Sequence, residues 1–176
     1  MIAIVDYGIG NLGSIQNMFK KIGIESQIVD QPEKVQKAQK IVLPGVGAFD
    51  AAVKKLNASG LRDILEEKAL NEKIPFLGIC LGMQLLSRGS EEGKCEGLGW
   101  IDAFTYKFSF NDPKLKVPHM NWNEIRPVRT SPLLYGLEQE AFFYFSHSYF
   151  VQARQEEVLS VTHYGVPFTS AVGREN

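Results

Sequence analysis

Cys80 stands between two glycines in the segment Gly78-Ile79-Cys80-Leu81-Gly82, a glycine-x-nucleophile-x-glycine pattern with cysteine in place of serine. Such a pattern is typical of a sharp strand-to-helix turn that lifts one side chain above a sheet. The helix dipole there favours the thiolate form of Cys80, and the N–H of Leu81 points to where an oxyanion would develop. A small buried cysteine at a strand end is the alternative, but the paired glycines favour a nucleophile.

A second glycine-rich turn, Pro44-Gly45-Val46-Gly47, follows one expected strand and precedes an expected helix. Its backbone N–H groups can form an anion-binding nest. Neighbouring parallel strands deliver both loops to the same edge of a sheet, so two oxyanion donors would stand beside one thiolate. This combination suits acyl transfer from a carbonyl. Cys95 lies in a charged segment that we expect to be an exposed loop, and it receives no role.

A competing pattern is Gly8-x-Gly10-x-x-Gly13, which follows a strand, opens a helix and has Asp30 at the spacing of a ribose-binding acid. Taken alone, it predicts a dinucleotide-binding oxidoreductase, which stays as an alternative hypothesis. Asp6 argues against it, because a carboxylate where the backbone must approach the pyrophosphate would repel that group. A tight turn that needs glycine for steric reasons explains the same residues.

The elements that position these turns alternate between strand and helix patterns over the first 90 residues. Short apolar runs predict strands, and apolar residues spaced by three and four predict helices. The expected strands are 2–5, 24–29, 41–43 and 76–79, and the expected helices are 12–22, 48–56, 61–70 and 81–86. This alternation predicts an α/β fold, a mostly parallel sheet flanked by helices on both faces. After Gly97, alternating patterns predict an added antiparallel β portion with strands at 104–110, 142–145, 149–151, 158–162 and 168–172.

The composition narrows the class of protein. A chain of 176 residues with 44% hydrophobic residues is of a size for one domain with a sizeable core. A net charge of −1 argues against a nucleic-acid binder that relies on bulk positive charge. Two cysteines cannot build a disulfide framework, which favours a reducing, cytoplasmic setting. No apolar run approaches 18 residues and the first residues lack a signal-peptide pattern, so we expect no membrane association.

Taken together, five blocks of sequence resemble the class I (triad) glutamine amidotransferases, and among these the family of glutaminase subunits of imidazole glycerol phosphate synthases. The resemblance covers essentially the whole chain and implies a flavodoxin-like fold. The five blocks are Asp6-Tyr7-Gly8-Ile9-Gly10-Asn11, Pro44-Gly45-Val46-Gly47-Ala48-Phe49, Gly78-Ile79-Cys80-Leu81-Gly82-Met83-Gln84, Val117-Pro118-His119-Met120-Asn121-Trp122-Asn123 and Tyr144-Phe145-Ser146-His147-Ser148-Tyr149.

The resemblance implies a role for each matching residue. Cys80 would attack the side-chain amide of glutamine, with Val46, Gly47 and Leu81 supplying the oxyanion donors. A glutamyl thioester would form, ammonia would leave, and water would release glutamate. No cofactor and no metal is implied. The residues that would hold glutamine are Gly45, Gln84, His147, Ser148 and Tyr149.

The family passes its ammonia to a cyclase partner of (β/α)8 fold, which makes imidazole glycerol phosphate and an aminoimidazole carboxamide ribotide in histidine biosynthesis. Similar amidotransferases aminate sugars for surface polysaccharides, and this acceptor stays as an alternative. Asn121 stands where the family usually has glycine, and we expect it to keep a turn there. The residues that align with the partner-docking face are Ile9, Asn11, Pro118, Met120, Trp122 and Tyr144.

The family takes its general base and orienting acid from a His-Pro-Glu motif, and the sequence contains no such motif. Neither His119, His147 nor His163 matches the base position. We therefore expect residues 1–176 to form one amidotransferase domain that lacks the strand and helix carrying this motif. A truncated or incompletely recorded glutaminase and a catalytically impaired pseudoenzyme are the two hypotheses that follow.

Overall fold

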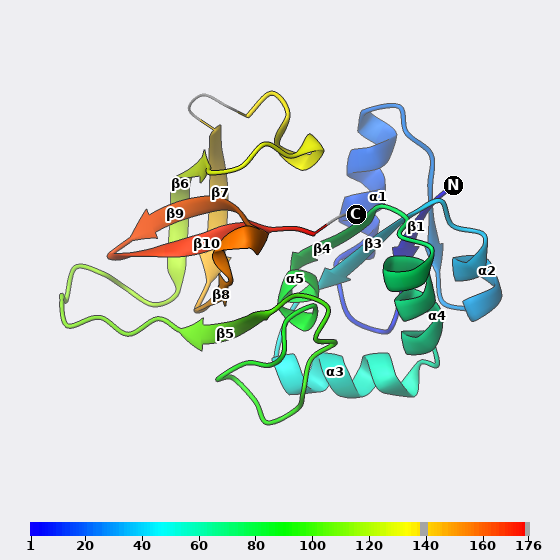
Figure 1. The fold of residues 1–176 in the computed structure, drawn as a ribbon, viewed down its shortest axis with the longest axis horizontal. Helices are drawn as coiled ribbons and strands as arrows, with labels where there is room; N and C mark the ends of the chain where they lie inside the picture. Colours follow the sequence, from blue (N-terminus) through cyan, green and yellow to red (C-terminus); the bar gives the residue numbers. More distant parts are fainter. Residues whose placement is uncertain (138–140, 175–176) are drawn as a thin grey trace.

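A computed structural model describes residues 1–137 and 141–174 (Figure 1). The predicted end of the domain at Asn176 lies outside the described residues. The elements of the first half are β1 (Ile2–Val5), α1 (Leu12–Lys21), β2 (Ser26–Val29), α2 (Pro32–Gln36), β3 (Lys40–Gly45), α3 (Phe49–Ala58), α4 (Arg62–Glu66), the π-helical turn η1 (Glu67–Asn71), β4 (Phe76–Cys80) and α5 (Leu81–Leu85). Those of the second half are β5 (Ala103–Lys107), β6 (His119–Pro127), the 3-10 turn η2 (Pro132–Leu134), β7 (Ala141–His147), β8 (Tyr149–Ala153), the 3-10 turn η3 (Gln155–Glu157), β9 (Val158–Tyr164) and β10 (Val166–Val172).

The first four strands form the predicted parallel sheet, in the order β2-β1-β3-β4. Alternate residues of these strands, among them Val5 and Leu43, face a core that α3, α4 and α5 complete with Phe49, Leu65 and Leu85. Figure 1 shows α1 above this sheet and α3 below it, so helices cover both faces as predicted. Because β3 and β4 are neighbours, the loops that follow them open at the same edge of the sheet.

The second half forms a six-stranded sheet in the order β5-β8-β10-β9-β6-β7, with antiparallel pairing throughout. It confirms the added antiparallel portion, and it lies beside the parallel sheet in Figure 1. A separate small core fills one side of this sheet, built by Ile125, Leu134, Ala141 and Leu159. The turn between β7 and β8 faces the edge of the parallel sheet, where the predicted site lies.

Several predicted boundaries were wrong. The strand expected at 41–43 continues through Pro44 to Gly45, because both residues pair in register with β4. The strand expected at 104–110 ends at Lys107, and Phe108 leaves the ladder to join a cluster of aromatic rings. Strand β6 and helix α2 were not predicted. Among the described residues, no helix is both long and apolar enough to cross a bilayer.

Candidate functional site

Cys80 sits at the predicted strand-to-helix turn, as the last residue of β4 and directly before Leu81, the first residue of α5. Its backbone has φ 55° and ψ −115°, a conformation that residues other than glycine rarely adopt. Cys80 pairs in register with Gly45 of the neighbouring strand, so the nucleophile candidate lies beside the second glycine-rich turn. The structure therefore brings together the two loops that the sequence predicted to meet.

The glycines around this turn are required by close packing of backbone against backbone. A Cβ on Gly82 would lie 1.9 Å from the carbonyl oxygen of Leu43, and one on Gly78 would lie 2.8 Å from the carbonyl oxygen of Gly82. A Cβ on Gly45 would lie 2.7 Å from the nitrogen of Gly82. Only glycine lets α5 begin directly on strands β3 and β4 and present Cys80 at their ends.

The two loops open into a cavity of about 590 Å³ that also reaches the β7–β8 turn. Most of the predicted catalytic, oxyanion and glutamine-site residues line it, and Gly45 lies just behind them against the first turn of α5. The lining residues are Val46, Gly47, Ala48, Cys80, Leu81, Gln84, Glu92, Pro118, Ser146, His147, Ser148 and Tyr149.

The Cys80 thiol is exposed to this cavity, but its protonation differs from the expectation. Partial burial raises the pKa of Cys80 above the ordinary thiol value, and the hydrogen bond from the N–H of Leu81 only partly offsets this. The N–H at the helix N-terminus thus favours the thiolate as predicted, but burial outweighs it, and the pKa of Cys80 lies above that of an ordinary thiol.

Two polar groups in the cavity are suited to a cationic ligand. The side-chain oxygen of Gln84 is buried and has no hydrogen-bond partner among the described residues. The carboxylate of Glu92 accepts a hydrogen bond from the N–H of Phe49 at 3.0 Å and so lies at the start of α3. Glu92 is not among the predicted site residues, because its charged segment resembles an ordinary solvated loop.

The Gly8–Gly13 segment supports the second glycine-rich turn from behind. The buried hydroxyl of Tyr7 donates to the carbonyl oxygen of Pro44 at 2.8 Å, and a Cβ on Gly10 would lie 3.2 Å from the Pro44 ring. Burial holds the pKa of Tyr7 well above its ordinary value, so the phenol stays a hydrogen-bond donor. Lys55 from α3 binds the carbonyl oxygen of Gly8 at 2.7 Å and covers the turn. These contacts, and positive φ angles of 82° and 128°, explain Gly8 and Gly10 without a dinucleotide, whereas Gly13 has no close neighbour of this kind.

His119 and His147 form a hydrogen-bonded pair at the wall of the cavity. They are opposite one another in the β6–β7 register, and Nδ1 of His119 lies 2.9 Å from Nε2 of His147. Nδ1 of His147 lies 2.8 Å from the carbonyl oxygen of Tyr149, so both its ring nitrogens are occupied. His163 lies apart from the cavity lining, with an exposed side chain on β9.

Acid is expected to destabilise the fold through this pair. Burial and then the neighbouring His147 lower the pKa of His119 to about 4, and burial lowers the pKa of His147 despite its bond to Tyr149. Between pH 6.5 and 4 the unfolded chain binds a proton on His119 that the folded chain does not, so the free energy of unfolding falls as the pH drops. For His119 the loss is about 3 kcal/mol.

Urea unfolding at pH 7 and pH 4.5 measures this loss. The titratable side chains that face His119 are His147 and Tyr164. Replacement of His119 by asparagine should reduce the acid loss, whereas His163→Gln, at an exposed position, should leave it unchanged. An equal acid loss in the wild type and in His119→Asn would contradict the assignment.

The residues predicted to dock a partner gather mainly on one face of β6 and β7. Met120 and Trp122 are 58% and 63% exposed, and Tyr144 is 55% exposed with its ring 5.8 Å from that of Trp122. Pro118 adjoins this face at the cavity rim. Ile9 and Asn11 lie on the loop before α1. Asn121 lies inside β6, and it is not among the described residues with a positive φ, so the turn expected there was wrong.

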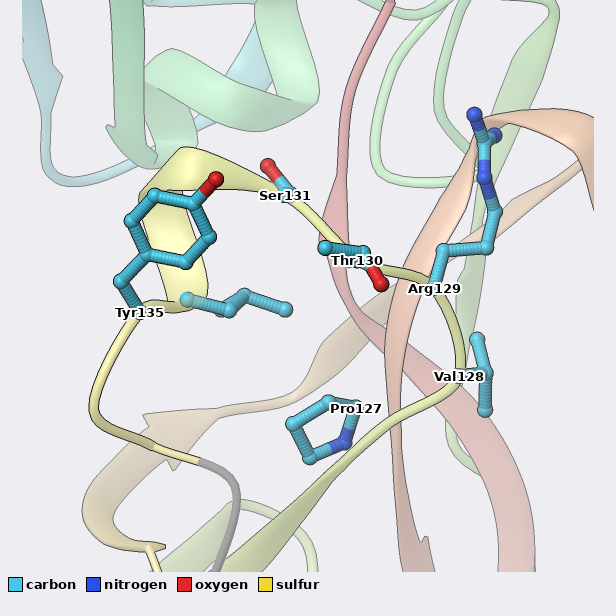
Figure 2. Close-up of a pocket in the computed structure, with 7 residues that line it drawn as sticks. Pro127, Val128, Arg129, Thr130, Ser131 and Tyr135 are labelled. Carbon is cyan, nitrogen blue, oxygen red and sulfur yellow. The ribbon is translucent and has the colours of Figure 1, made fainter.

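A second hollow, of about 360 Å³, contains none of the predicted site residues. It lies between the end of β6 and η2, and Figure 2 shows the side chains of Pro127 and Tyr135 beside it, with the guanidinium of Arg129 directed away. Cys95 was expected in an exposed loop but is partly buried, because Asp50 binds the N–H groups of Lys94 and Cys95. No group of three or more His, Cys, Asp or Glu residues suited to a metal occurs in the described ranges.

Comparison with known proteins places this geometry in context. Residues 3–170 match the family described as Glutamine amidotransferase class-I. The imidazole glycerol phosphate synthase subunit HisH 2 of Methanococcus maripaludis is 49% identical, with 100% of this chain and 87% of the relative covered. The subunit HisH 2 of Pseudomonas aeruginosa is 44% identical with the same coverage. A crystal structure described as a glutamine amidotransferase shares the fold, with a TM-score of 0.67, 18% identity and coverage of 96% and 89%.

Proposed function

Because the chain belongs to the class-I glutamine amidotransferase family, we propose that it is the glutaminase subunit of an imidazole glycerol phosphate synthase. It hydrolyses glutamine to glutamate and ammonia, and the ammonia serves histidine biosynthesis in the cytoplasm. The observation that carries the proposal is Cys80, which is raised on a strained turn beside the glycine-rich loop in a cavity of about 590 Å³.

The residues that line the cavity have distinct roles in the proposed reaction. The Cys80 thiolate attacks the side-chain amide carbon of glutamine, and N–H groups of Val46, Gly47 and Leu81 stabilise the oxyanion. The C–N bond then breaks, ammonia leaves with the added proton, and water cleaves the thioester to glutamate. The reaction needs a proton acceptor for Cys80, because burial raises the pKa of its thiol. His147 does not take that role, since both its ring nitrogens are engaged.

The remaining polar groups hold the amino-acid end of glutamine. The Gln84 oxygen and the Glu92 carboxylate are acceptors, which suit the α-ammonium group of the substrate. Gly45 fixes the loop against α5, and the turn formed by His147, Ser148 and Tyr149 closes the opposite wall. No metal or cofactor is needed for this chemistry.

The test is glutamine hydrolysis by the full-length protein together with its synthase partner. Ammonia and glutamate should appear in equal amounts, and a diazo-ketone analogue of glutamine should label Cys80 and abolish the reaction. A protein that binds the partner but neither releases ammonia nor reacts with the analogue would be a pseudoenzyme, and the proposed function would be wrong.

The partner is a cyclase subunit of (β/α)8 fold, which docks on the exposed face around Trp122. Aromatic side chains at the centre of an interface commonly contribute about 2 kcal/mol or more. Trp122→Ala is therefore expected to weaken partner binding by about 30-fold or more, measured as a dissociation constant by calorimetry. Tyr135→Ala is the control, because Tyr135 is similarly exposed but directly follows η2 and lines the second hollow. Equal losses in both variants would contradict the proposed face.

A further inference from the structure

We propose that His119 is a positioning residue of the glutamine site, which acts by holding His147 in a single neutral tautomer. His147 in that form fixes the turn of residues 147–149 at the cavity wall. The inference rests on the proposed function only in taking glutamine as the ligand. The hydrogen bonds from His119 to His147 and from His147 to Tyr149 are present in the folded protein whatever its ligand.

The surroundings of His119 hold its ring in one plane. The side chain is fully buried on β6. Its ring stacks on Tyr164 at a centroid distance of 4.0 Å and on Phe145 at 5.1 Å, with interplanar angles of 19° and 20°. A ring clamped between two others cannot turn over without opening the packing, so Nδ1 of His119 faces His147 permanently.

The partners at each nitrogen leave one arrangement of protons. The carbonyl oxygen of Tyr149 can only accept, so Nδ1 of His147 carries the hydrogen. Nε2 of a neutral His147 is then an acceptor, and Nδ1 of His119 must donate to it across 2.9 Å. Nε2 of His119 is left as an acceptor that faces the amide nitrogen of Asn123 at 3.4 Å. That amide also donates to the carbonyl oxygen of His163 at 3.0 Å, which uses its second hydrogen.

Every other neutral arrangement places like groups together. A hydrogen on Nε2 of His147 would face the hydrogen on Nδ1 of His119, and the lone pair left on Nδ1 would face the Tyr149 oxygen. Each mismatch leaves buried polar groups unpaired, at a cost of about 1–3 kcal/mol per group. The acceptor at Tyr149 and the donor at Nδ1 of His119 therefore favour the same tautomer of His147, one from each side of its ring.

The selected tautomer acts on the substrate site through the backbone. Ser148 and Tyr149 both line the cavity, and both of their carbonyl oxygens are tied to the protein. The Ser148 oxygen accepts from the N–H of Phe108 at 3.0 Å, and the Tyr149 oxygen accepts from His147. Two successive peptide planes are thus fixed at the wall that holds glutamine. Without the His147 hydrogen bond, the Tyr149 carbonyl oxygen at the start of β8 loses the donor that faces the turn.

The first experiment compares His119→Leu with His119→Asn, each in the Cys80→Ala background so that glutamine binds without turnover. Leucine fills the apolar site but has no donor, whereas asparagine keeps an N–H near the position of Nδ1. The positioning role predicts about 10-fold weaker glutamine binding for His119→Leu by calorimetry, and recovery to within about 3-fold for His119→Asn. A role in packing alone predicts the reverse order, because asparagine buries a polar group in a smaller volume. Wild-type affinity in His119→Leu would overturn the proposal.

The second experiment needs no variant and no activity. Nitrogen-15 NMR of the folded protein, with labelled histidines, should find both rings neutral, both protonated at Nδ1, and a scalar coupling between the two nitrogens that share a hydrogen. A proton on Nε2 of His147, or the absence of coupling, would overturn the proposal even if glutamine were hydrolysed. The predicted tautomers in a protein that hydrolyses no glutamine would instead count against the proposed function alone.

Discussion

Replacement of Cys80 by alanine is expected to lower glutamine hydrolysis by about 10³-fold or more, because no thioester can form without the sulfur. The loop of Gly45, Val46 and Gly47 would still bind the amide carbonyl, but a bound carbonyl without a nucleophile does not react. The measurement is ammonia release by the full-length protein with its partner present. Partner affinity should be unchanged, since Cys80 lies inside the cavity.

Cys95→Ala is the matched control for this result. Cys95 is the other cysteine, and it lies on a loop that Asp50 holds in place, outside the cavity lining. Near-normal turnover is expected in Cys95→Ala, and near-normal turnover in Cys80→Ala would show that the nucleophile assignment is wrong. Labelling of Cys80 by the diazo-ketone should also accelerate as the pH rises above 7, because burial raises the pKa of its thiol.

The sequence was sufficient to predict the parallel sheet and the meeting of its two glycine-rich loops. Both predictions rest on local rules, since a short apolar run predicts a buried strand and parallel neighbours end at the same edge. The packing of α5 on β3 requires Gly82, and its packing on β4 requires Gly78, which explains the glycines on either side of Cys80. These contacts join regular elements of the parallel sheet and its first helical turn, and for such elements the sequence pattern predicts the structure.

Strand β6 could not be predicted in the same way, because its two faces invert the usual pattern. Its outward positions carry exposed Met120 and Trp122, and an inward position carries His119, which is buried. A half-buried strand is recognised by apolar residues on its buried face and polar residues on its exposed face. In β6 apolar residues are exposed and a histidine is buried, so this alternation is absent. The buried His119 is stabilised by a hydrogen bond to His147 and by stacking on two aromatic rings, all from other strands. A local sequence pattern cannot predict contacts between strands that are distant in the sequence.

The pKa of Cys80 shows a second limit of local reasoning. The position of the thiol at a helix N-terminus indicated a lowered pKa, and the N–H of Leu81 does lower it, but burial of the sulfur has the larger effect. Burial depends on residues that are distant in sequence and line the same cavity, so the sign of the net shift could be determined only from the structure.

Gly82→Ala is expected to destabilise the protein by about 3 kcal/mol or more, measured by urea unfolding. The added Cβ would lie 1.9 Å from the carbonyl oxygen of Leu43, whereas real contacts of this kind stay beyond 3.0 Å. The obstacle is strand backbone, which cannot move aside as a side chain would. Separation of α5 from β3 by about 1 Å is the only relief, and it would also displace the N–H of Leu81 from Cys80, so activity should fall with stability.

Gly13→Ala separates this clash from the general effect of alanine in a helix. Gly13 lies in α1, has no positive φ, and nothing would lie within 4 Å of an added Cβ. Alanine there should stabilise the protein by about 0.5–1 kcal/mol, because it restricts the unfolded chain without strain. The same substitution thus has opposite signs at two helical glycines, and the difference measures how tightly α5 is seated on the sheet. Similar unfolding midpoints in the two variants would mean that α5 can shift on β3 at little cost, and that Gly82 is not what holds the Cys80 turn in place.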